Sequence, residues 1–522
     1  MLDNERSSAS IMPIPSMIKL ARNIVLLTAM FCQVGASVAQ TFTVLQNFSA
    51  TQQNTNGVYV NAEGASPFDG LVSFGGYLYG TSAAGGSEGS GTIFRIKPDG
   101  TGFVVLKTFS ALGSWPNQTN SDGANLTSRL TPHLGALYGV AASGGNAGSG
   151  TIFKINTNGT GFEVLKHFSA TDPDGNNSDG AYPASGLTLS GNSFYGTATL
   201  GGNNGSGTLF KIDADGTGFT VLRHFSANER AAWPYWGLLI SGDVIYGYAE
   251  GSFGSGFQYG RIYSIKTDGT EFTNLHSFNT SGIEGIYPQG TLLMAGNEEL
   301  YGATSSGGDS SATFSGTIFK MSKDGTGFTV LKRFDASNGP ITDDGYQPQG
   351  GLILSGNVLY GTTAYGGHGG SGTVFKLFTD GTGFSVLKHF DHVSLNNSGA
   401  QTNSDGALSR AGLLLELNTL YGETTEGGSG GSGTLFSLGL FQPSIQNVIN
   451  TTDGHFGFAN GGFGFTVNGP VGSTVVISYS TNNLLWTVAL TKLLSELEST
   501  FYFFDSSASN QPVRLYKAEF QP

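Results

Sequence analysis

The chain has almost no cysteine: Cys32 is the only one in 522 residues. It lies within an N-terminal segment that we interpret as an export signal, so the mature chain is expected to contain no thiol. This excludes disulfides, thiolate metal sites and cysteine nucleophiles.

Charged residues are also scarce, at 12% of the chain against about 25% in ordinary proteins. The net charge is −13 and no cluster of lysine or arginine follows the N-terminal segment, so nucleic acid is not an expected partner. Glycine is abundant instead, with 82 residues, which indicates many tight turns and few long helices. The 12% of aromatic residues supply enough apolar surface to argue against disorder.

The N-terminal segment has the order of a secretory signal. Lys19 and Arg22 precede the apolar residues 24–31, and Ser-Val-Ala at 37–39 is a small-x-small sequence. We expect a signal peptide over residues 1–39, cleaved after Ala39. The apolar run is shorter than the roughly 20 residues that span a membrane, and no later segment is long enough. The mature chain is therefore expected to be secreted or displayed on the cell surface, without a transmembrane span.

The body of the chain is a tandem repeat of about 57 residues. A Tyr-Gly pair after two hydrophobic residues recurs at Tyr79, Tyr138, Tyr195, Tyr246, Tyr301, Tyr360 and Tyr421. A Gly-Thr-(Ile/Leu/Val)-Phe-(Lys/Arg) element follows at Phe94, Phe153, Phe210, Phe319 and Phe375, with altered copies at Tyr263 and Phe436. A third element, Asp-Gly-Thr-Gly-Phe before an apolar strand, recurs with variations at Phe103, Phe162, Phe219, Phe272, Phe328 and Phe384.

The third element has no copy after Phe436, and its seventh strand lies instead at residues 41–49. This circular offset is expected of a ring whose first and last blades share strands between the termini, and not of an open solenoid. Each repeat holds four candidate strands, the content of one propeller blade. The sequence therefore predicts an all-β protein with a seven-bladed β-propeller over residues 40–441.

The glycines fall where short hairpins need positive φ. Asp215-Gly216 separates two apolar strands, and the glycine-rich residues 201–207 lie between two others. The glycine-rich stretch lacks the Lys-Ser/Thr ending of a phosphate-binding loop. We interpret it as a hairpin tip.

These motifs, in the order Leu-Tyr-Gly-x-Thr, Gly-Gly, Gly-Thr-Ile-Phe-Lys and Asp-Gly-Thr-Gly-Phe, resemble the choice-of-anchor tandem-repeat GloVer-containing proteins. The resemblance covers residues 41 to about 437. It implies an exported bacterial protein with a surface anchor and implies no activity. A looser likeness to kelch repeats concerns architecture only.

Residues 443–522 have a different pattern of short alternating strands, such as 463–467 and 474–479. Their spacing by Gly, Asn and Ser predicts a small C-terminal β-sandwich. The segment resembles modules that end many exported bacterial proteins, which implies a role in attachment or sorting.

In a repeat protein, residues present in every blade are expected to be structural, whereas a single site on the ring breaks the symmetry. Four histidines occupy one slot of the repeat, and an acid-Gly pair also recurs, so we interpret both as structural. The histidines are His167, His224, His276 and His389. For the acids, calcium or a polycationic ligand remains the alternative.

One loop is a candidate calcium site because its alternating oxygen side chains suit a hard cation. The candidate ligands are Asp172, Asp174, Asn176 and Asp179. The competing interpretation is a turn-rich loop without metal. No other cofactor is expected.

The fourth repeat departs most from the consensus, with aromatic and charged residues where other repeats have small ones. The candidate ligand-binding residues are Trp233, Tyr235, Trp236, Tyr248, Glu250, Tyr259 and Arg261, with Trp115 as a separate exposed aromatic. Apolar rings beside a few polar groups are typical of sugar or peptide sites. The alternative is that Trp233 occupies the repeat position of Tyr182 and Tyr287, and that large side chains fill the space left by the shorter repeat.

No nucleophile with a base and no metal cage has identifying spacing in the sequence. We therefore expect a binding or scaffold module for an extracellular polysaccharide or protein. One alternative is a polysaccharide lyase or glycosidase with acids near the ring axis, such as Asp179, Asp344 and Glu250. Another is a structural protein stabilised by calcium. The oligomeric state is not predicted.

Overall fold

The computed structural model describes residues 41–440 apart from 228–230, 251–258, 280–281, 297, 309–314, 337–340 and 398. Beyond them it describes 449–450, 457–459, 462–468, 474–480, 487–493, 500–505 and 515–521. Residues 40–440 form one compact unit, and residues 1–39 and 441–522 fall in another. The expected signal peptide lies outside the described residues.

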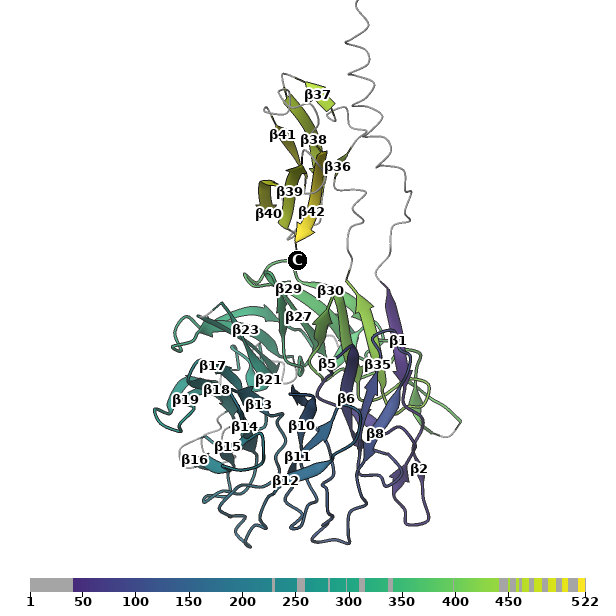
Figure 1. Ribbon diagram of the computed structural model, residues 1–522, viewed down its shortest axis with the longest axis vertical. Helices are drawn as coiled ribbons and strands as arrows, with labels where there is room; N and C mark the ends of the chain where they lie inside the picture. Colours follow the sequence, from purple (N-terminus) through teal and green to yellow (C-terminus); the bar gives the residue numbers. More distant parts are fainter. Residues whose placement is uncertain are drawn as a thin grey trace, which may run out of the picture. The chain divides into compact units, whose positions relative to one another are not determined.

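The larger unit is a seven-bladed propeller built from antiparallel four-stranded sheets (Figure 1). Blade 1 contains β5 (Val72–Phe74), β6 (Tyr77–Ala84), β7 (Thr92–Ile96) and β8 (Val104–Thr108), with β4 (Ala65–Pro67) added beside β6. Blade 2 contains β9 (Thr131–His133), β10 (Ala136–Ala141), β11 (Thr151–Asn156) and β12 (Glu163–His167). Blade 3 contains β13 (Thr188–Ser190), β14 (Ser193–Ala198), β15 (Thr208–Asp213) and β16 (Thr220–His224). Blade 4 contains β17 (Leu239–Ser241), β18 (Val244–Ala249), β19 (Arg261–Lys266) and β20 (Thr273–Ser277).

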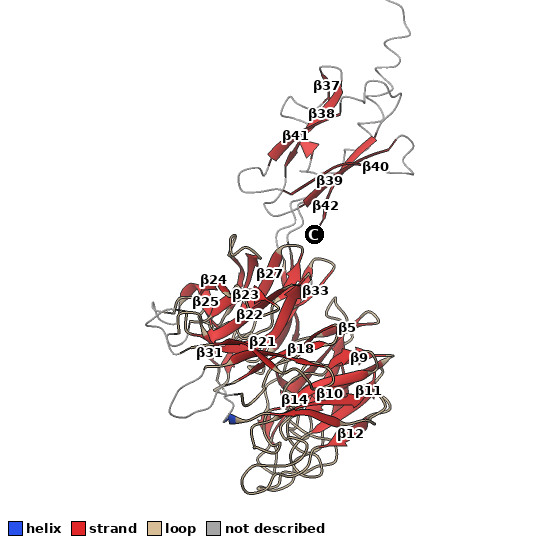
Figure 2. Cartoon of the chain, turned by 90° about the vertical axis from the view of Figure 1, so that its left-hand side faces the viewer, coloured by secondary structure: helices blue, strands red, loops and turns tan. Residues whose placement is uncertain are grey.

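The remaining blades follow the same order, and strands and loops dominate throughout (Figure 2). Blade 5 contains β21 (Ile286–Ala295), β22 (Glu299–Ser306), β23 (Thr317–Ser322) and β24 (Thr329–Arg333). Blade 6 contains β26 (Ile353–Ser355), β27 (Val358–Thr363), β29 (Thr373–Phe378) and β30 (Ser385–His389). Blade 7 contains β33 (Leu414–Glu416), β34 (Thr419–Thr424), β35 (Thr434–Gly439) and β1 (Phe42–Asn47). Loop hairpins are β2 (Gln52–Gln53) with β3 (Tyr59–Val60), β25 (Thr342–Tyr346) with β28 (Tyr365–Gly367), and β31 (Ser394–Leu395) with β32 (Gln401–Thr402).

The ring is closed by the first strand of the chain. β1 pairs antiparallel with β35, from Phe42 opposite Leu438 to Asn47 opposite Thr434, and Figure 1 draws these two strands side by side. Phe48, which follows β1, is fully buried among residues of blades 7 and 1. The closure predicted from the circular offset of the repeat is therefore confirmed.

One glycine in each blade sets the register of the two central strands. In blade 1, Gly80 of β6 lies opposite Phe94 of β7, and a Cβ on Gly80 would come 2.5 Å from the ring of Phe94. In blade 2, Gly139 and Phe153 repeat this arrangement at 2.6 Å. The recurring Tyr-Gly and Gly-Thr-Ile-Phe elements are thus two halves of one contact, in which the phenylalanine ring covers a glycine backbone.

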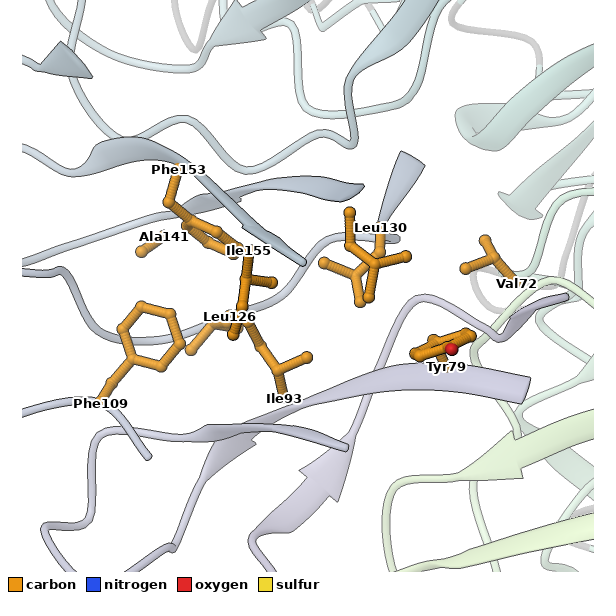
Figure 3. Close-up of a cluster of buried hydrophobic side chains, with 10 residues drawn as sticks. Val72, Tyr79, Ile93, Phe109, Leu126, Leu130, Ala141, Phe153 and Ile155 are labelled. Atoms are coloured by element: carbon orange, nitrogen blue, oxygen red, sulfur yellow. The ribbon is translucent and has the colours of Figure 1, made fainter. Parts of the chain in front are cut away.

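The hydrophobic core lies between blades, with one cluster of buried side chains at each of the seven interfaces. Between blades 1 and 2, Ile93 and Tyr79 meet Leu126, Leu130 and Phe153 (Figure 3). The second and third strands of each blade are buried along most of their length, because a neighbouring blade covers each face. This explains their nearly continuous runs of apolar residues.

The recurring acid-Gly pairs hold the connections between blades. The carboxylate of Asp122 bonds the Lys107 ammonium at 2.5 Å and accepts the backbone N–H of Ser110 at 3.1 Å. The same ion pair recurs between Lys166 and Asp179, Lys332 and Asp344, and Lys388 and Asp405. These lysines belong to the outermost strands, so the paired acids lie towards the rim of the ring.

The C-terminal residues contain two antiparallel sheets among their described parts. One sheet contains β36 (Ile449–Asn450), β37 (Gly457–Ala459), β38 (Gly462–Asn468) and β41 (Thr500–Asp505). The other contains β39 (Thr474–Ser480), β40 (Thr487–Leu493) and β42 (Leu515–Gln521). Within the described stretches of the whole chain, no helix is long and apolar enough to cross a membrane.

Removal of β1 is expected to open the ring. A chain shortened to begin at Gln52 loses the outer strand of blade 7 together with Phe48, and loss of a buried phenylalanine side chain alone costs about 3–5 kcal/mol. We expect a clearly lower midpoint of thermal unfolding by calorimetry, whereas a chain that begins at Gln40 keeps the midpoint of the longer chain. Equal midpoints for the two shortened chains would show that β1 does not fasten the ring.

The ion pair between Lys107 and Asp122 is expected to stabilise the fold. Asp122→Ala leaves a largely buried lysine without its partner and the Ser110 N–H without its acceptor, which we expect to lower the free energy of unfolding by about 3 kcal/mol or more. The control is Asp99→Ala, which removes a carboxylate that accepts from Thr101 in an exposed turn. In chemical denaturation the control should lose much less stability, and an equal loss would contradict the prediction.

Candidate functional site

The connections between blades and the loops between second and third strands lie at the same end of the ring, because successive strands of a blade alternate in direction. We call this end the interblade face. At one equivalent position in each connection a residue other than glycine has positive φ: Ser66, Asn125, Tyr182, Trp233, Tyr287, Gln347 and Leu408. Such a conformation is strained for residues other than glycine and clusters at functional sites.

Aromatic residues occupy this strained position in three consecutive blades. Tyr182, Trp233 and Tyr287 have φ of 62°, 50° and 56°. The expected equivalence of these three residues is therefore confirmed. Tyr182 and the nearby Tyr235 remain 37% and 40% exposed, so part of each ring faces solvent.

Four tyrosines and Glu250 come from the connections around blades 3 to 5 and from the loop of blade 4 on the interblade face, and we call this group the aromatic patch: Tyr182, Tyr235, Glu250, Tyr259 and Tyr287. The rings of Tyr259 and Tyr287 meet edge to face, with centroids 5.7 Å apart. Burial, followed by the charges of Glu250 and Tyr182, raises the pKa of Tyr235. Burial, followed by Tyr259 and Glu250, raises the pKa of Tyr287. Glu250 thus affects the pKa of both Tyr235 and Tyr287, and Tyr287 is in ring contact with Tyr259.

Glu250 is the acid of the aromatic patch, and burial raises its pKa to about 7. Its backbone is held in place, since its carbonyl accepts the N–H of Ala232 at 3.0 Å. A carboxyl group that is poised near neutral pH among aromatic rings can accept or donate a hydrogen bond. Tyr235, Glu250 and Tyr259 were predicted from the sequence as binding residues, but Tyr182 and Tyr287 were not.

Other residues predicted in the fourth repeat lie elsewhere. Tyr248 is 1% exposed in the core between blades 4 and 5, so its assignment to a binding surface was wrong: its ring packs against the next blade. Trp236 packs partly buried against the same core. Arg261 begins β19 opposite Ser277. Trp115 is 82% exposed in the connection before blade 2 and is not part of the aromatic patch.

The predicted calcium loop is held by its own hydrogen bonds. Oδ1 of Asp172 accepts the N–H groups of Asp174 at 3.0 Å and Asn176 at 2.7 Å, while Asp179 pairs with Lys166. The described residues contain no group of three or more His, Cys, Asp or Glu side chains arranged to hold a metal. Calcium binding at this loop stays a prediction.

The recurring histidine slot has a structural use. Nδ1 of three of these histidines accepts a backbone N–H from the glycine-rich loop of the same blade, and asparagine does the same in blade 7. The acceptor and donor pairs are His167 with Asn146, His224 with Asn203, His389 with His368, and Asn47 with Ser429. Histidine in three blades and asparagine in blade 7 can each fill this slot, because both offer an acceptor.

Three charged residues lie close together where the inner strands of blades 1 and 2 begin, and we call them the axial cluster: Asp69, Arg129 and Glu423. Oδ2 of Asp69 accepts the backbone N–H of Arg129 at 2.9 Å. Oε2 of Glu423 accepts the N–H of Gly70, also at 2.9 Å. Burial raises the pKa of Asp69 to about 6 and that of Glu423 to about 8. None of these three residues was predicted from the sequence as part of a site.

The axial position was predicted for different acids. Asp179 and Asp344 were expected near the axis, but both pair with lysines of outermost strands, so that expectation was wrong. The signal for the true axial residues was present in the repeat. Arg129 stands where five other blades have glycine, and Glu423 stands where three have threonine.

Comparison with known structures finds propeller-like relatives of low similarity. An oligogalacturonate lyase in complex with manganese matches 78% of this chain and 98% of its own, with 10% identity and a TM-score of 0.41. A puromycin-hydrolyzing peptidase of Mycobacterium tuberculosis matches 78% of this chain and 62% of its own, with 10% identity and a TM-score of 0.42. TolB from Acinetobacter baumannii matches 58% of this chain and 61% of its own, with 14% identity and a TM-score of 0.31. None of these carries an inference about activity.

No curated protein matches the chain. A family of repeat sequences does, described as the Gloeobacter/Verrucomicrobia repeat. Its matches cover residues 36–178, 174–343 and 248–436, which is most of the chain and all seven blades. The protein therefore belongs to the Gloeobacter/Verrucomicrobia (GloVer) repeat family.

Proposed function

We propose that this protein is an exported propeller that binds an extracellular polysaccharide through its aromatic patch. The observation that carries the proposal is the ring contact between Tyr259 and Tyr287, together with the electrostatic effect of Glu250 on Tyr235 and Tyr287. Sugar rings have apolar faces and polar edges, so they stack on aromatic rings while a carboxyl group orients their hydroxyls. The patch offers both kinds of contact on one face.

The backbone of the patch supports this proposal. Tyr182 and Tyr287 keep a left-handed conformation that costs roughly 1–3 kcal/mol for a residue other than glycine. Ser66 and Asn125 have the same conformation in blades without an aromatic there, so the conformation belongs to the connection and does not depend on the ring. Successive connections thus have the same backbone conformation at this position, and only the side chain differs from blade to blade.

We also propose that the two sheets of the C-terminal residues pack as a small β-sandwich that attaches the propeller at the cell surface. The alternation of residues 463–467 and 474–479 supports two packed faces, and Phe465, Val467, Val475 and Ile477 are fully buried. In this arrangement export through the N-terminal segment delivers the protein, and the propeller meets its ligand outside the cell.

The polysaccharide site is tested by removing two rings of the patch. The purified chain is screened on a glycan array with and without calcium, and the strongest glycan is titrated by calorimetry. Tyr182→Ala and Tyr235→Ala are each expected to lower its affinity by about tenfold, through loss of stacking.

The matched control is Phe74→Ala, because Phe74 is 38% exposed and ends the inner strand of blade 1 at the opposite face. This variant should keep the full affinity. If all three variants bind equally, or if no glycan binds, the aromatic patch is not a polysaccharide site.

A further inference from the structure

The three charges of the axial cluster break the repeat at the centre of the ring. At the position of Arg129, glycine is found in five blades, as Gly70, Gly186, Gly237, Gly351 and Gly412, and threonine in blade 5. These glycines allow close packing, since a Cβ on Gly70 would come 2.6 Å from the carbonyl oxygen of Gly412. An arginine side chain at this point is therefore a departure that the fold itself does not require.

The guanidinium group of Arg129 is not closely paired with any of the described residues, although burial lowers its pKa and the charges of Asp69 and Glu423 act against this by raising it. It makes no ion pair or hydrogen bond there, and its Nε is buried without an acceptor. The residue bonds Asp69 only through its backbone N–H. A largely buried cation whose donors make no direct hydrogen bond to the neighbouring acids is costly, and its planar fork of donors suits a carboxylate.

Glu423 offers a second unused polar group. Its side chain is 1% exposed, and Oε1 has no donor or acceptor partner among the described residues, whereas Oε2 bonds Gly70. In three other blades a threonine occupies this position, and Thr81 and Thr362 each bond a carbonyl of the next blade. A threonine at this position is therefore sufficient to bond the next blade. The longer side chain of Glu423 adds an oxygen, Oε1, that has no hydrogen-bond partner among the described residues.

We propose that the axial cluster binds a carboxylate flanked by hydroxyl groups, as found in a uronic acid. The guanidinium of Arg129 pairs with the ligand carboxylate, Glu423 donates a hydrogen bond through its free oxygen, and Asp69 accepts from a ligand hydroxyl. This site uses no residue of the aromatic patch, so its test is independent of the test of the polysaccharide proposal.

The charge balance of the cluster gives the proposal a pH signature. The ionisable groups that act on one another here are Asp69, Arg129 and Glu423. Below about pH 6 both acids are protonated and Arg129 leaves a net positive charge; above about pH 8 both are ionised and the net charge is negative. An anionic ligand therefore gains affinity as the pH falls, because its binding favours the protonated acids.

The test is calorimetric titration of the purified chain with glucuronate, glucose and acetate at pH 5.5 and 8.5. We expect glucuronate to bind at pH 5.5 and at least about tenfold more weakly at pH 8.5. Glucose lacks the carboxylate and acetate lacks the hydroxyls, so both should bind at least about tenfold more weakly than glucuronate. Equal binding of glucose or acetate, or no binding of glucuronate, would overturn the assignment.

Two variants locate the site without disturbing the repeat. Arg129→Gly and Glu423→Thr each install the residue that other blades carry, so both should keep the unfolding midpoint and lose glucuronate binding. Arg129→Lys keeps the charge without the planar fork and should bind more weakly, which provides a measurement even where Arg129→Gly does not fold. Unchanged affinity in Arg129→Lys or Glu423→Thr contradicts the site.

A patch variant separates the two proposals. Tyr182→Ala with Tyr235→Ala should bind glucuronate as the unaltered chain does. Loss of glucuronate binding in this variant would move the site to the aromatic patch and overturn the axial assignment. A failed glycan screen alone leaves the axial site intact.

Discussion

The fold depends on a glycine covered by an aromatic ring at the centre of every blade. At each of these seven pairs the second strand has no Cβ, and the ring from the third strand occupies the space. A one-residue slip would put a side chain under the ring, so this contact specifies register from within the blade. Blade 4 keeps the glycine, Gly247, and replaces phenylalanine by Tyr263. The pair therefore tolerates a change of ring but not, in any blade, a change of glycine.

With register set inside each blade, ring closure needs only one shared strand and a set of equivalent interfaces. β1 completes blade 7, and the cluster around Phe48 makes the seventh interface resemble the other six. Four lysine–aspartate pairs then hold connections, as in the pair of Lys107 with Asp122. Acids that recur in the repeat are engaged by lysines and backbone N–H groups. Function has to be sought in charges and rings that do not recur.

The architecture of the propeller could be predicted from the sequence because a repeat shows every structural contact several times. The circular offset of residues 41–49 predicted the closing strand, and this needed no knowledge of side-chain packing. Exposure was harder to predict. Tyr248 and Tyr235 both look like unusual aromatics of the fourth repeat, but one packs against blade 5 and the other is 40% exposed. Only the direction of each side chain from its backbone separates them. The axial cluster was missed because its members are far apart in the chain, with Asp69 and Glu423 separated by 354 positions, and no motif surrounds any of them.

In a closed ring of similar blades, each residue that departs from the repeat consensus has a defined position in the structure. Tyr182, Tyr235 and Tyr287 deviate around blades 3 to 5, whereas Asp69, Arg129 and Glu423 deviate in blades 1, 2 and 7. Both groups belong to the same end of the ring, because the connections and the ends of the second strands meet there. The contacts that stabilise the fold repeat around the ring. Individual positions at this end can therefore hold residues that the stability of the fold does not require. For this reason a residue such as Arg129, which replaces a glycine and makes no ion pair or side-chain hydrogen bond among the described residues, is better explained by binding than by stability.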